Sequence, residues 1–512
     1  MNAQDSFNDR LKKAGKTIST PRVIPRAEHS ISRTNISDSA VKVLYRLKDA
    51  GYKAYLVGGG VRDMLLGREP KDFDIATDAH PEEVQEQFRS CHLIGRRFRL
   101  AHVRVGRDVV EVATFRANVP SAEEGEARSA KRGEDLHTES GRIMRDNVYG
   151  TLEEDAWRRD FTINALYYNI ADFSVVDYTG GLEDLKAGWI RLIGDPVQRY
   201  REDPVRMLRA VRFAAKLGFR IHPDTEDPLF DLGYLLEDIP SARLYEEVLK
   251  LFMGGCALET FELLRHYRLF EHLFPQTEDD LAQEREGFPS ELVARALANT
   301  DARVAAGKPV TPAFLFAALL WGPMRRQAEP LQAGGESEIQ AIQEAGDVVV
   351  MRQVQRIALP KRFSLPMREI WTMQPRFTQI NGKRPFSLLT HPRFRAAYDF
   401  LLLRGESGED VLDLCEWWTK FQEVNADAQG RASAAGGRML GAADAHGRAS
   451  AAGGTTARMQ EVEQRKERLP RMPGAADERH VPVAAIDAET RAPAKKRRRP
   501  RKRRKPAGAA AG

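Results

Sequence analysis

A short apolar run that ends in three consecutive glycines is the feature that most constrains the fold. Residues 54–57 read AYLV, the glycines Gly58, Gly59 and Gly60 follow, and VRDMLLG continues at helical spacing until Gly67. This order predicts a strand, a glycine turn and a short helix. Backbone N–H groups at such a turn favour an anion such as phosphate, and a tight structural turn is the alternative. The motif is neither a Walker loop nor a dinucleotide fingerprint, because Gly-Lys-Ser/Thr is missing and Asp63 replaces the last glycine.

Two acidic residues follow the glycine turn by twelve residues. Asp72 and Asp74 flank Phe73 in KDFDIA, residues 71–76, which reads as a second strand. Strand alternation would place both carboxylates on one face and Phe73 on the other. Paired carboxylates that face water suit Mg²⁺, which accepts hard oxygen ligands and keeps some of its waters. A solvated edge strand is the alternative, and the phosphate-favouring turn close by makes the metal site the better interpretation.

The rest of the first half alternates short strands and helices. We expect a helix over 81–91, a hairpin of strands 101–105 and 109–115, and a mobile loop over 118–142. Thr151 and Glu154 form a capping box that predicts a helix through EDAWRRDFTINALYY. A turn-rich stretch at 177–188 and a second helix in EDPVRMLRAVRFAAKLGF, residues 202–219, should follow.

From about Pro240 to Gln422 the sequence shows only helical periods. After Val424 the composition falls to Ala, Gly, Arg, Asp and Glu, with the octapeptide GRASAAGG at 430 and 447. Such a segment buries too little apolar area to fold. We therefore expect an irregular extension, a catalytic head, a helical neck, an all-α body and a disordered tail, at 1–40, 41–195, 196–265, 266–424 and 425–512.

Ten of the eleven residues in KKRRRPRKRRK, 495–505, are basic. The formal net charge is +6, so the rest of the chain carries about −4. A basic tail on a mildly acidic protein predicts binding to RNA phosphates, and a tail that only aids solubility is the alternative. The candidate RNA-binding residues are Lys495, Lys496, Arg497, Arg498, Arg499, Arg501, Lys502, Arg503, Arg504 and Lys505.

Several classes of protein are disfavoured by the sequence. The longest apolar run, residues 313–321, is too short for a membrane helix, which needs about 20 residues. The first 16 residues carry no apolar stretch, which favours a cytoplasmic protein over a secreted one. The three cysteines, Cys91, Cys256 and Cys415, are too scattered for a disulfide framework or a zinc site.

Five motifs together resemble the class II nucleotidyltransferases of the DNA polymerase β superfamily. They run in family order from Leu56 to Phe219 and read LVGGGVRDMLLG, KDFDIA, VEVATFR, RRDFTINALYY and REDPVRMLRAVRFAAKLGF. That family contains the tRNA CCA-adding enzymes and the bacterial poly(A) polymerases. LIGRRFRLAHV, residues 93–103, is similar to a stretch of the poly(A) polymerase branch, as are IALPKRF and HPRFRAAYDFLLLR. The resemblance implies an α+β fold, with a polymerase-β-like head and mixed sheet before an all-α neck and body.

The same resemblance implies the catalytic residues. Asp72 and Asp74 would hold two catalytic Mg²⁺ ions. Asp160 is our first choice to complete the catalytic set, and Glu111, on a strand of the same sheet, is the rival third carboxylate. The alternative for Asp160 is a helix-end residue paired with Arg158 or Arg159.

Arginines would bind the nucleotide, because guanidinium groups match phosphate oxygens in pairs. The resemblance places Arg62, Asp63, Arg116, Arg158 and Arg159 against triphosphate or sugar. Arg206, Arg209 and Arg212 recur every third residue along the neck helix, and a solvated basic stripe is their alternative. Asp203 and Arg206, three residues apart, would read the adenine edge of ATP.

The sequence therefore predicts an enzyme that adds AMP from ATP to RNA 3′ ends without a template, which implies a role in mRNA processing and decay. A CCA-adding enzyme is the rival in the same class, and a catalytically silent RNA-binding protein is the rival of another class. The RNAs chosen, the oligomeric state and any RNA-decay protein partners cannot be read from the sequence.

Overall fold

The computed structural model describes residues 20–95, 99–117, 148–283 and 288–425. The loop expected at 118–142 and the basic tail at 495–505 lie outside these residues. Within the described ranges, no helix combines the length and apolar character that a bilayer crossing requires.

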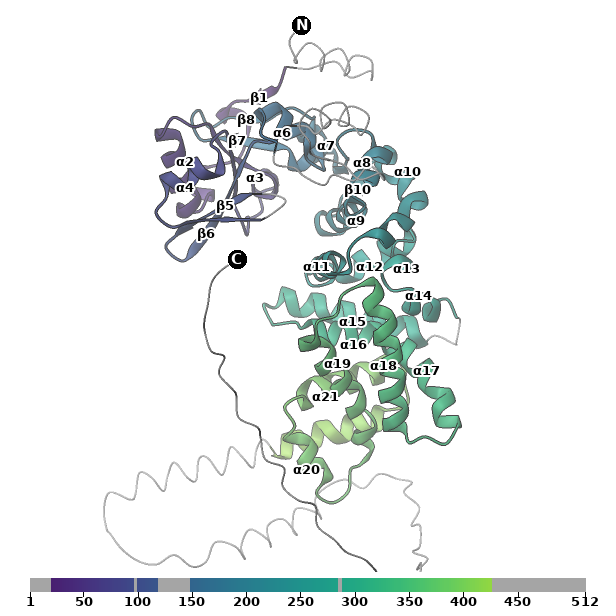
Figure 1. Ribbon diagram of the computed structural model, residues 1–512. Helices are drawn as coiled ribbons and strands as arrows, with labels where there is room; N and C mark the ends of the chain where they lie inside the picture. The colour runs from purple at the N-terminus through teal and green to yellow at the C-terminus, as the bar shows by residue number, and fades with distance from the viewer. Residues whose placement is uncertain (1–19, 96–98, 118–147, 284–287, 426–512) are drawn as a thin grey trace, which may run out of the picture. The chain divides into compact units, whose positions relative to one another are not determined.

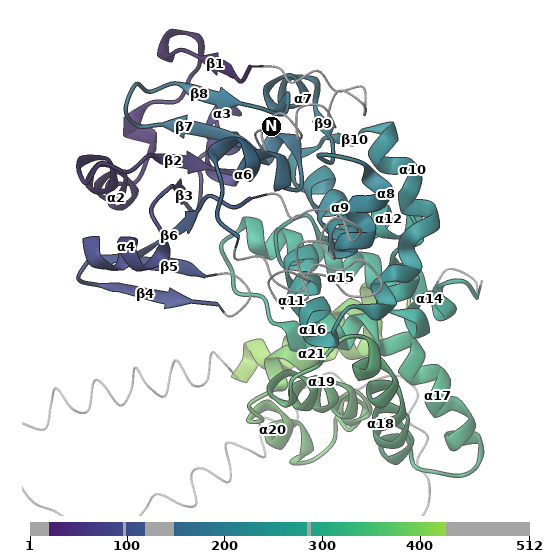
Figure 2. The ribbon, with the colours of Figure 1, turned by 45° about the horizontal axis from the view of Figure 1, so that its top comes forward.

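An eight-stranded mixed sheet organises the first half of the chain, as expected (Figures 1 and 2). Its only parallel pair among the described residues is β3 with β6. All its other neighbours are antiparallel. The order across the sheet is β1 (Arg22–Ile24), β8 (Val175–Asp177), β7 (Leu166–Asn169), β2 (Ala54–Val57), β3 (Asp74–Thr77), β6 (Asp108–Thr114), β5 (Leu100–Val105) and β4 (Cys91–Ile94).

The two faces of the sheet differ. Helices α2 (Asp38–Asp49) and α4 (Pro81–Gln87) pack against β2, β6 and β5, and cover one face (Figure 2). Leu56, Ile75 and Val112 are registered neighbours in the apolar core that includes the buried side chains of α2. Alternation puts the next residues on the opposite face. That face carries Asp74 and Glu111, which are registered partners on β3 and β6.

The expected helix after Thr151 is much shorter than the pattern suggested. The capping box of Thr151 and Glu154 is present, and it begins α6 (Leu152–Arg158). The rest of the segment forms one turn of 3-10 helix, Thr162–Asn164, and then β7, and no further α-helix. Leu166, Tyr167 and Tyr168 are at most 1% exposed because β7 lies between β2 and β8. A short apolar run buried on both faces carries no alternation that would distinguish a strand from a helix.

Smaller departures follow from local chemistry. The helix expected over 81–91 ends at Gln87, and Cys91 begins an unexpected strand, β4. The extension expected to be irregular contributes β1 at the sheet edge. In the stretch expected to be turns, the Asp177 carboxylate accepts bonds from four backbone N–H groups, of Thr179 through Leu182. These bonds initiate α7 (Gly181–Ala187), and β9 (Trp189–Ile190) with β10 (Arg220–Ile221) forms a small parallel pair.

From Pro223 to Asn425 the described residues contain helices and no strand, which confirms the all-α second half. The helix expected over 202–219 is α9, which runs from Val205 to Leu217, and it begins late because Asp203 is extended and Pro204 follows it; Glu202 ends a separate helix, α8. The main helices after β9 are α8 (Pro196–Glu202), α9 (Val205–Leu217), α10 (Pro223–Leu232), α11 (Ser241–Phe252), α12 (Ala257–His266), α13 (Phe270–Leu273), α14 (Pro275–Leu281), α15 (Phe288–Ala305), α16 (Pro312–Leu319), α17 (Trp321–Ala333), α18 (Glu338–Arg356), α19 (Lys361–Met373), α20 (Arg384–Leu389) and α21 (Phe394–Glu406).

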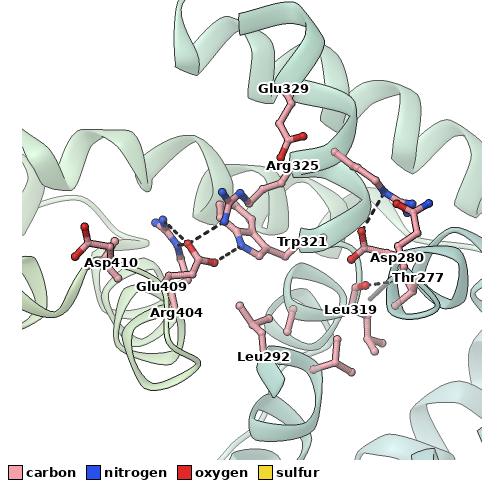
Figure 3. A pocket seen from close by; sticks show the side chains of 16 residues that line it. Thr277, Asp280, Leu292, Leu319, Trp321, Arg325, Glu329, Arg404, Glu409 and Asp410 are labelled. Atoms are coloured by element: carbon pink, nitrogen blue, oxygen red, sulfur yellow. Dashed lines mark hydrogen bonds and ion pairs between the residues drawn. The ribbon is translucent and has the colours of Figure 1, made fainter. Parts of the chain in front are cut away.

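A pocket of about 570 Å³ lies among α14, α15, α17 and the end of α21 (Figure 3). The Glu409 carboxylate at its wall accepts a bond from Trp321 Nε1 at 3.0 Å and two from Arg404 at 2.8 and 3.0 Å. Arg325 approaches the same carboxylate at 3.1 Å. These arginines lower the pKa of Glu409 although burial alone would raise it. The polar groups of this wall therefore satisfy one another and join α17 to α21.

Candidate active site

The glycine turn and the acidic pair lie against each other. Gly58 has φ +77°, which a glycine adopts readily, and this turns β2 into α3 (Gly59–Leu65). A Cβ added to Gly58 would lie 3.8 Å from Asp74 Oδ2, and one on Gly60 would lie 3.1 Å from the backbone oxygen of Asp72. The turn therefore needs glycine because the acidic segment passes directly over it.

Three carboxylates gather beside this turn. Asp72 and Asp74 are exposed, while Phe73 packs toward the core, as alternation predicted. Glu111 stands directly beside Asp74 in the parallel pair of β3 and β6. Desolvation, the negative charge of Glu111 and then that of Asp72 raise the pKa of Asp74 to about 6, while Arg159 opposes them. Asp74 remains accessible to water, yet the protein around it and two like charges make its ionised form costly.

The donor chemistry of these carboxylates fits Mg²⁺. Hard carboxylate oxygens open to water are the ligands this ion prefers, and a cation would relieve the repulsion that raises the pKa of Asp74. In the ranges that the structure describes, no three His, Cys, Asp or Glu side chains converge as a preformed metal cluster. The assignment of a metal site thus rests on the chemistry of these three carboxylates and on the register of β3 with β6.

Asp160 occupies a different environment from the other predicted catalytic residues. Its residue is 9% exposed, its Oδ2 lies 2.7 Å from Arg209 Nη2, and its Oδ1 accepts the backbone N–H of Phe161 at 2.9 Å. Burial would raise the pKa of Asp160, but the charges of Arg209 and Arg206 outweigh burial and lower it. The pairing with Arg158 or Arg159 considered from sequence is wrong, because Arg209 of α9 is the partner.

Arg159 is held by two residues that the sequence did not single out. Its Nε donates to Tyr167 Oη at 2.8 Å, and its Nη2 donates to Asp155 Oδ2 at 3.0 Å. Tyr167 Oη also donates to Asp155 Oδ2, at 2.7 Å. Burial would raise the pKa of Asp155, but Arg159 and Tyr167 lower it. The spacing of Asp155 and Arg159 by four residues on one helix was the signal available in the sequence.

The free end of Arg159 points to the carboxylates. A Cβ on Gly58 would lie 3.8 Å from Arg159 Nη1, and the charge of Arg159 lowers the pKa of Asp74. Asp155 and Tyr167 therefore present a cation at the glycine turn. This is the arrangement expected of a group that meets a phosphate near a metal.

Arg62 faces inward, where we had expected it to meet phosphate. It is 2% exposed; its Nε and Nη2 donate to Asp63 at 2.8 and 2.7 Å, and its Nη1 donates to Asn164 at 2.7 Å. It ties α3 to the turn before β7. Arg116 and Arg158 are partly buried and already have interaction partners.

The neck arginines do not form a solvated stripe. Arg206 is 8% exposed, and its Nη1 donates to the backbone oxygen of Arg199 at 2.6 Å and to Glu202 at 3.1 Å. Arg209 and Arg212 are partly buried.

Desolvation and the charge of Arg206 lower the pKa of Arg199 to about 10. That side chain donates to the backbone oxygens of Arg158 and Arg159, so it fastens α8 to the end of α6.

Asp203 separates α8 from α9 and does not share a helix face with Arg206. Its Oδ2 accepts a bond from Arg243 Nη2 of α11 at 2.7 Å. Its Oδ1 is shielded from water and has no hydrogen-bond partner among the described residues. A buried acceptor without a partner costs about 1–3 kcal/mol. This oxygen therefore has an unfilled acceptor position.

The structure thus brings together the glycine turn, the three carboxylates and Arg159. It places Asp160 and Arg62 in buried arginine–acid pairs.

Three family models match the chain in series. They describe a poly A polymerase head domain at residues 54–191, a probable RNA and SrmB-binding site of polymerase A at 218–281, and an arginine-rich C-terminus of polymerase A at 334–505. These matches support the order of a head, a helical segment and a basic C-terminus.

Individual relatives agree with the family models. Poly(A) polymerase I of Salmonella typhi is 50% identical over 403 residues, which cover 78% of this chain and 85% of the relative. A CCA-adding enzyme of Lactobacillus helveticus is 39% identical over 237 residues, which cover 45% of this chain and 54% of that enzyme. The solved Thermotoga maritima CCA-adding enzyme complexed with tRNA shares the fold, with a TM-score of 0.51, 20% identity, and 78% and 86% coverage. The match along most of both chains shows that this protein belongs to the bacterial poly(A) polymerase family, as the resemblance of LIGRRFRLAHV to that branch predicted.

Proposed function

We propose that the chain is a template-independent polynucleotide adenylyltransferase. In this reaction the 3′-OH of an RNA attacks the α-phosphate of ATP, the bond to the β-phosphate breaks, and pyrophosphate leaves. The observation that carries the proposal is the gathering of Asp72, Asp74 and Glu111 beside Gly58 and Arg159, in a chain of this family.

Asp72, Asp74 and Glu111 are the carboxylates that would hold two Mg²⁺ ions. When bound, such ions stabilise charge on both the entering and the leaving oxygen of a phosphoryl transfer. Glu111 replaces Asp160 as the third carboxylate, because Glu111 is registered with Asp74 whereas Asp160 is held by Arg209. In this proposal Asp160 orients Arg209 and through it the neck helix.

The nucleotide would lie between the glycine turn and the neck. Arg159, fixed by Asp155 and Tyr167, would bind a phosphate oxygen. Asp203 Oδ1 would accept the N6 amino group of adenine, since an ionised carboxylate can only accept. Arg206 donates from Nη1 to the backbone oxygen of Arg199. Its remaining donors would bind the adenine ring nitrogen. The basic tail would hold the RNA backbone independently of sequence.

The test is nucleotide addition by the full chain. The purified protein, Mg²⁺ and an RNA with a free 3′-OH are incubated with each NTP separately, and the products are resolved on a gel. We expect a long ladder with ATP alone. A stop after a few CTP and ATP additions would indicate a CCA-adding enzyme, and no addition with intact RNA binding would indicate a silent RNA-binding protein.

Matched variants separate catalysis from folding. Asp72→Asn and Asp74→Asn should abolish addition while RNA affinity and the melting temperature are kept, because both side chains are exposed. Asp78→Asn, an exposed aspartate just past β3, serves as the control. If either of the first two variants kept more than about a tenth of wild-type turnover at saturating Mg²⁺, the metal-binding role of that residue would be wrong.

A further inference from the structure

A histidine stands beside the third carboxylate on the open face of the sheet. His102 on β5 is the registered partner of Glu111 on β6, and Glu111 is in turn the registered partner of Asp74 on β3. Registered neighbours on adjacent strands point to the same face. The order across the sheet is therefore His102, Glu111 and Asp74.

The contact between His102 and Glu111 is close and sheltered. The Nε2 atom of His102 lies 3.2 Å from Glu111 Oε1. That nitrogen is shielded from water, and among the described residues it has no hydrogen-bond partner, because its approach to Glu111 is close but not aligned as a hydrogen bond. The side chain of Glu111 is 51% exposed whereas that of His102 is 27% exposed. Of the two, His102 is thus the fixed group, and Glu111 is the one that can turn.

We propose that His102 is a positioning residue that keeps the Glu111 carboxylate on the open face of the sheet, beside Asp74, and so prepares the divalent-metal site. The proposal rests on the proposed function, since it takes Glu111 as the third carboxylate. His102 itself touches neither substrate nor metal. From its position 3.2 Å from Oε1, a small rotation would let Nε2–H donate to that oxygen of Glu111 and leave the other oxygen available as a ligand.

The need for such a residue follows from the electrostatics of the site. Asp74 and Glu111 are registered partners of like charge on adjacent strands, so without a cation these carboxylates repel one another. A half-exposed glutamate can relieve this repulsion by rotating into water. A neighbour that donates to it opposes that rotation and lowers the cost of forming the site.

The position of His102 also connects the segment at residues 93–103 with the active site. His102 lies within LIGRRFRLAHV, residues 93–103, the stretch whose likeness separates the two branches of the family. In the structure this segment supplies β4 and β5, the outer strands next to β6. Among the described residues of this segment, His102 is the one that lies beside Glu111.

The test measures binding of Mn²⁺ alone to the full chain, by electron paramagnetic resonance or calorimetry, and nucleotide addition as a function of Mg²⁺. His102→Leu should weaken Mn²⁺ binding and raise the Mg²⁺ concentration needed for half-maximal rate by about 10-fold, the lower end of such effects. His102→Gln, which keeps a donor near Nε2, should stay within about 3-fold of wild type.

His92→Leu is the matched control, because His92 is the registered partner of His102 on β4 and lies one strand further from Glu111. It should leave Mn²⁺ binding unchanged. If His102→Leu lowers the melting temperature, the comparison moves to the Glu111→Gln background. There the proposal expects His102→Leu to have no additional effect on Mn²⁺ binding.

Unchanged Mn²⁺ binding in His102→Leu, or an equal loss in His102→Leu and His102→Gln, would overturn the proposal. The same holds for an undiminished effect of His102→Leu in the Glu111→Gln background. Failure of the proposed function is distinguishable. A wild-type chain whose Mn²⁺ binding is weakened by His102→Leu but which adds no AMP would disprove the reaction and keep the positioning role.

Discussion

Arg159 and Asp155 form an ion pair across one turn of α6, with Arg159 Nη2 3.0 Å from Asp155 Oδ2. Asp155 also accepts a hydrogen bond from Tyr167 Oη at 2.7 Å. The buried carboxylate therefore holds both Arg159 and the tyrosine that Arg159 contacts. A pre-fixed guanidinium loses less side-chain freedom when it meets a phosphate. The pair therefore converts a flexible surface cation into an oriented one.

Asp155→Asn should leave Arg159 in place but loosen it. Because the amide carries no charge, we expect kcat/KM for ATP to fall by about 10-fold, as for a charge-assisted bond worth about 1.5–3 kcal/mol. Glu153→Gln, on the same helix, is the control and should stay near wild type. Steady-state kinetics with an RNA primer measure kcat/KM for both variants. An unchanged kcat/KM in Asp155→Asn would show that Asp155 has only a structural role.

Asp160→Asn tests which residue is the third carboxylate. We expect it to lower stability by about 1–3 kcal/mol, because Arg209 loses its partner, and to leave Mn²⁺ affinity unchanged. Glu111→Gln should do the reverse, with weaker Mn²⁺ binding and unchanged stability. Urea unfolding and metal titration of both variants provide the measurements. Weaker Mn²⁺ binding in Asp160→Asn at unchanged stability would restore Asp160 as a ligand.

The elements that the sequence predicted well have a strong local signal. Residues 54–57 form β2 as expected, and the hairpin of β5 and β6 differs from its prediction by about one residue at each end. The capping box at Thr151 is present because it depends only on neighbours in the chain. Such features need no information about the rest of the fold.

The features that the sequence missed depend on tertiary contacts. β7 reads like a buried helix, and only its place between β2 and β8 makes it a strand. For the arginines of α9 a solvated face was the alternative to nucleotide binding, and it is wrong for Arg206, which is buried while Glu202 and the Arg199 backbone accept its donors. Our proposal of Glu111 in place of Asp160 rests on the β3–β6 register, which no local pattern specifies.

Asp203→Ala should reduce discrimination between ATP and GTP. The unpartnered Oδ1 is the acceptor proposed for the adenine amino group, and loss of a buried hydrogen-bond partner costs about 1–3 kcal/mol. We therefore expect the ratio of kcat/KM values to fall by about 10-fold. Arg201→Ala, an exposed arginine of α8, is the control. An equal loss for all four NTPs would show that Asp203 only holds Arg243 and the neck.

Deletion of residues 490–512 should weaken RNA binding without altering which nucleotide is added, because Lys and Arg contacts to phosphate do not depend on sequence. With single strands, each neutralised phosphate contributes about −0.7 to the slope of log K against log salt, so loss of about 4 contacts changes the slope by about 3. A variant with the ten basic residues changed to Gln controls for length. An unchanged slope would assign the tail to solubility.

Glu409 gives a pH dependence whose sign follows from its partners. Trp321, Arg404 and Arg325 stabilise the ionised carboxylate, so the pKa of Glu409 is lower in the folded protein than its ordinary value. The unfolded chain then takes up the proton at higher pH than the folded one. This contribution to stability is complete above about pH 4.3, the ordinary glutamate value, and is lost as pH falls through the lower folded pKa.

Glu409→Gln cannot titrate and leaves buried arginine donors without a charged partner (Figure 3). We expect it to be less stable than wild type by about 1–3 kcal/mol at pH 7, and the difference should shrink as the pH falls below the ordinary glutamate value. Urea unfolding followed by tryptophan fluorescence at several pH values measures this. Glu416→Gln, which removes an exposed pair with Lys420, should give a curve parallel to wild type. A constant difference between Glu409→Gln and wild type at every pH would show that Glu409 acts through packing, because a residue that acts through its charge must lose its advantage on protonation.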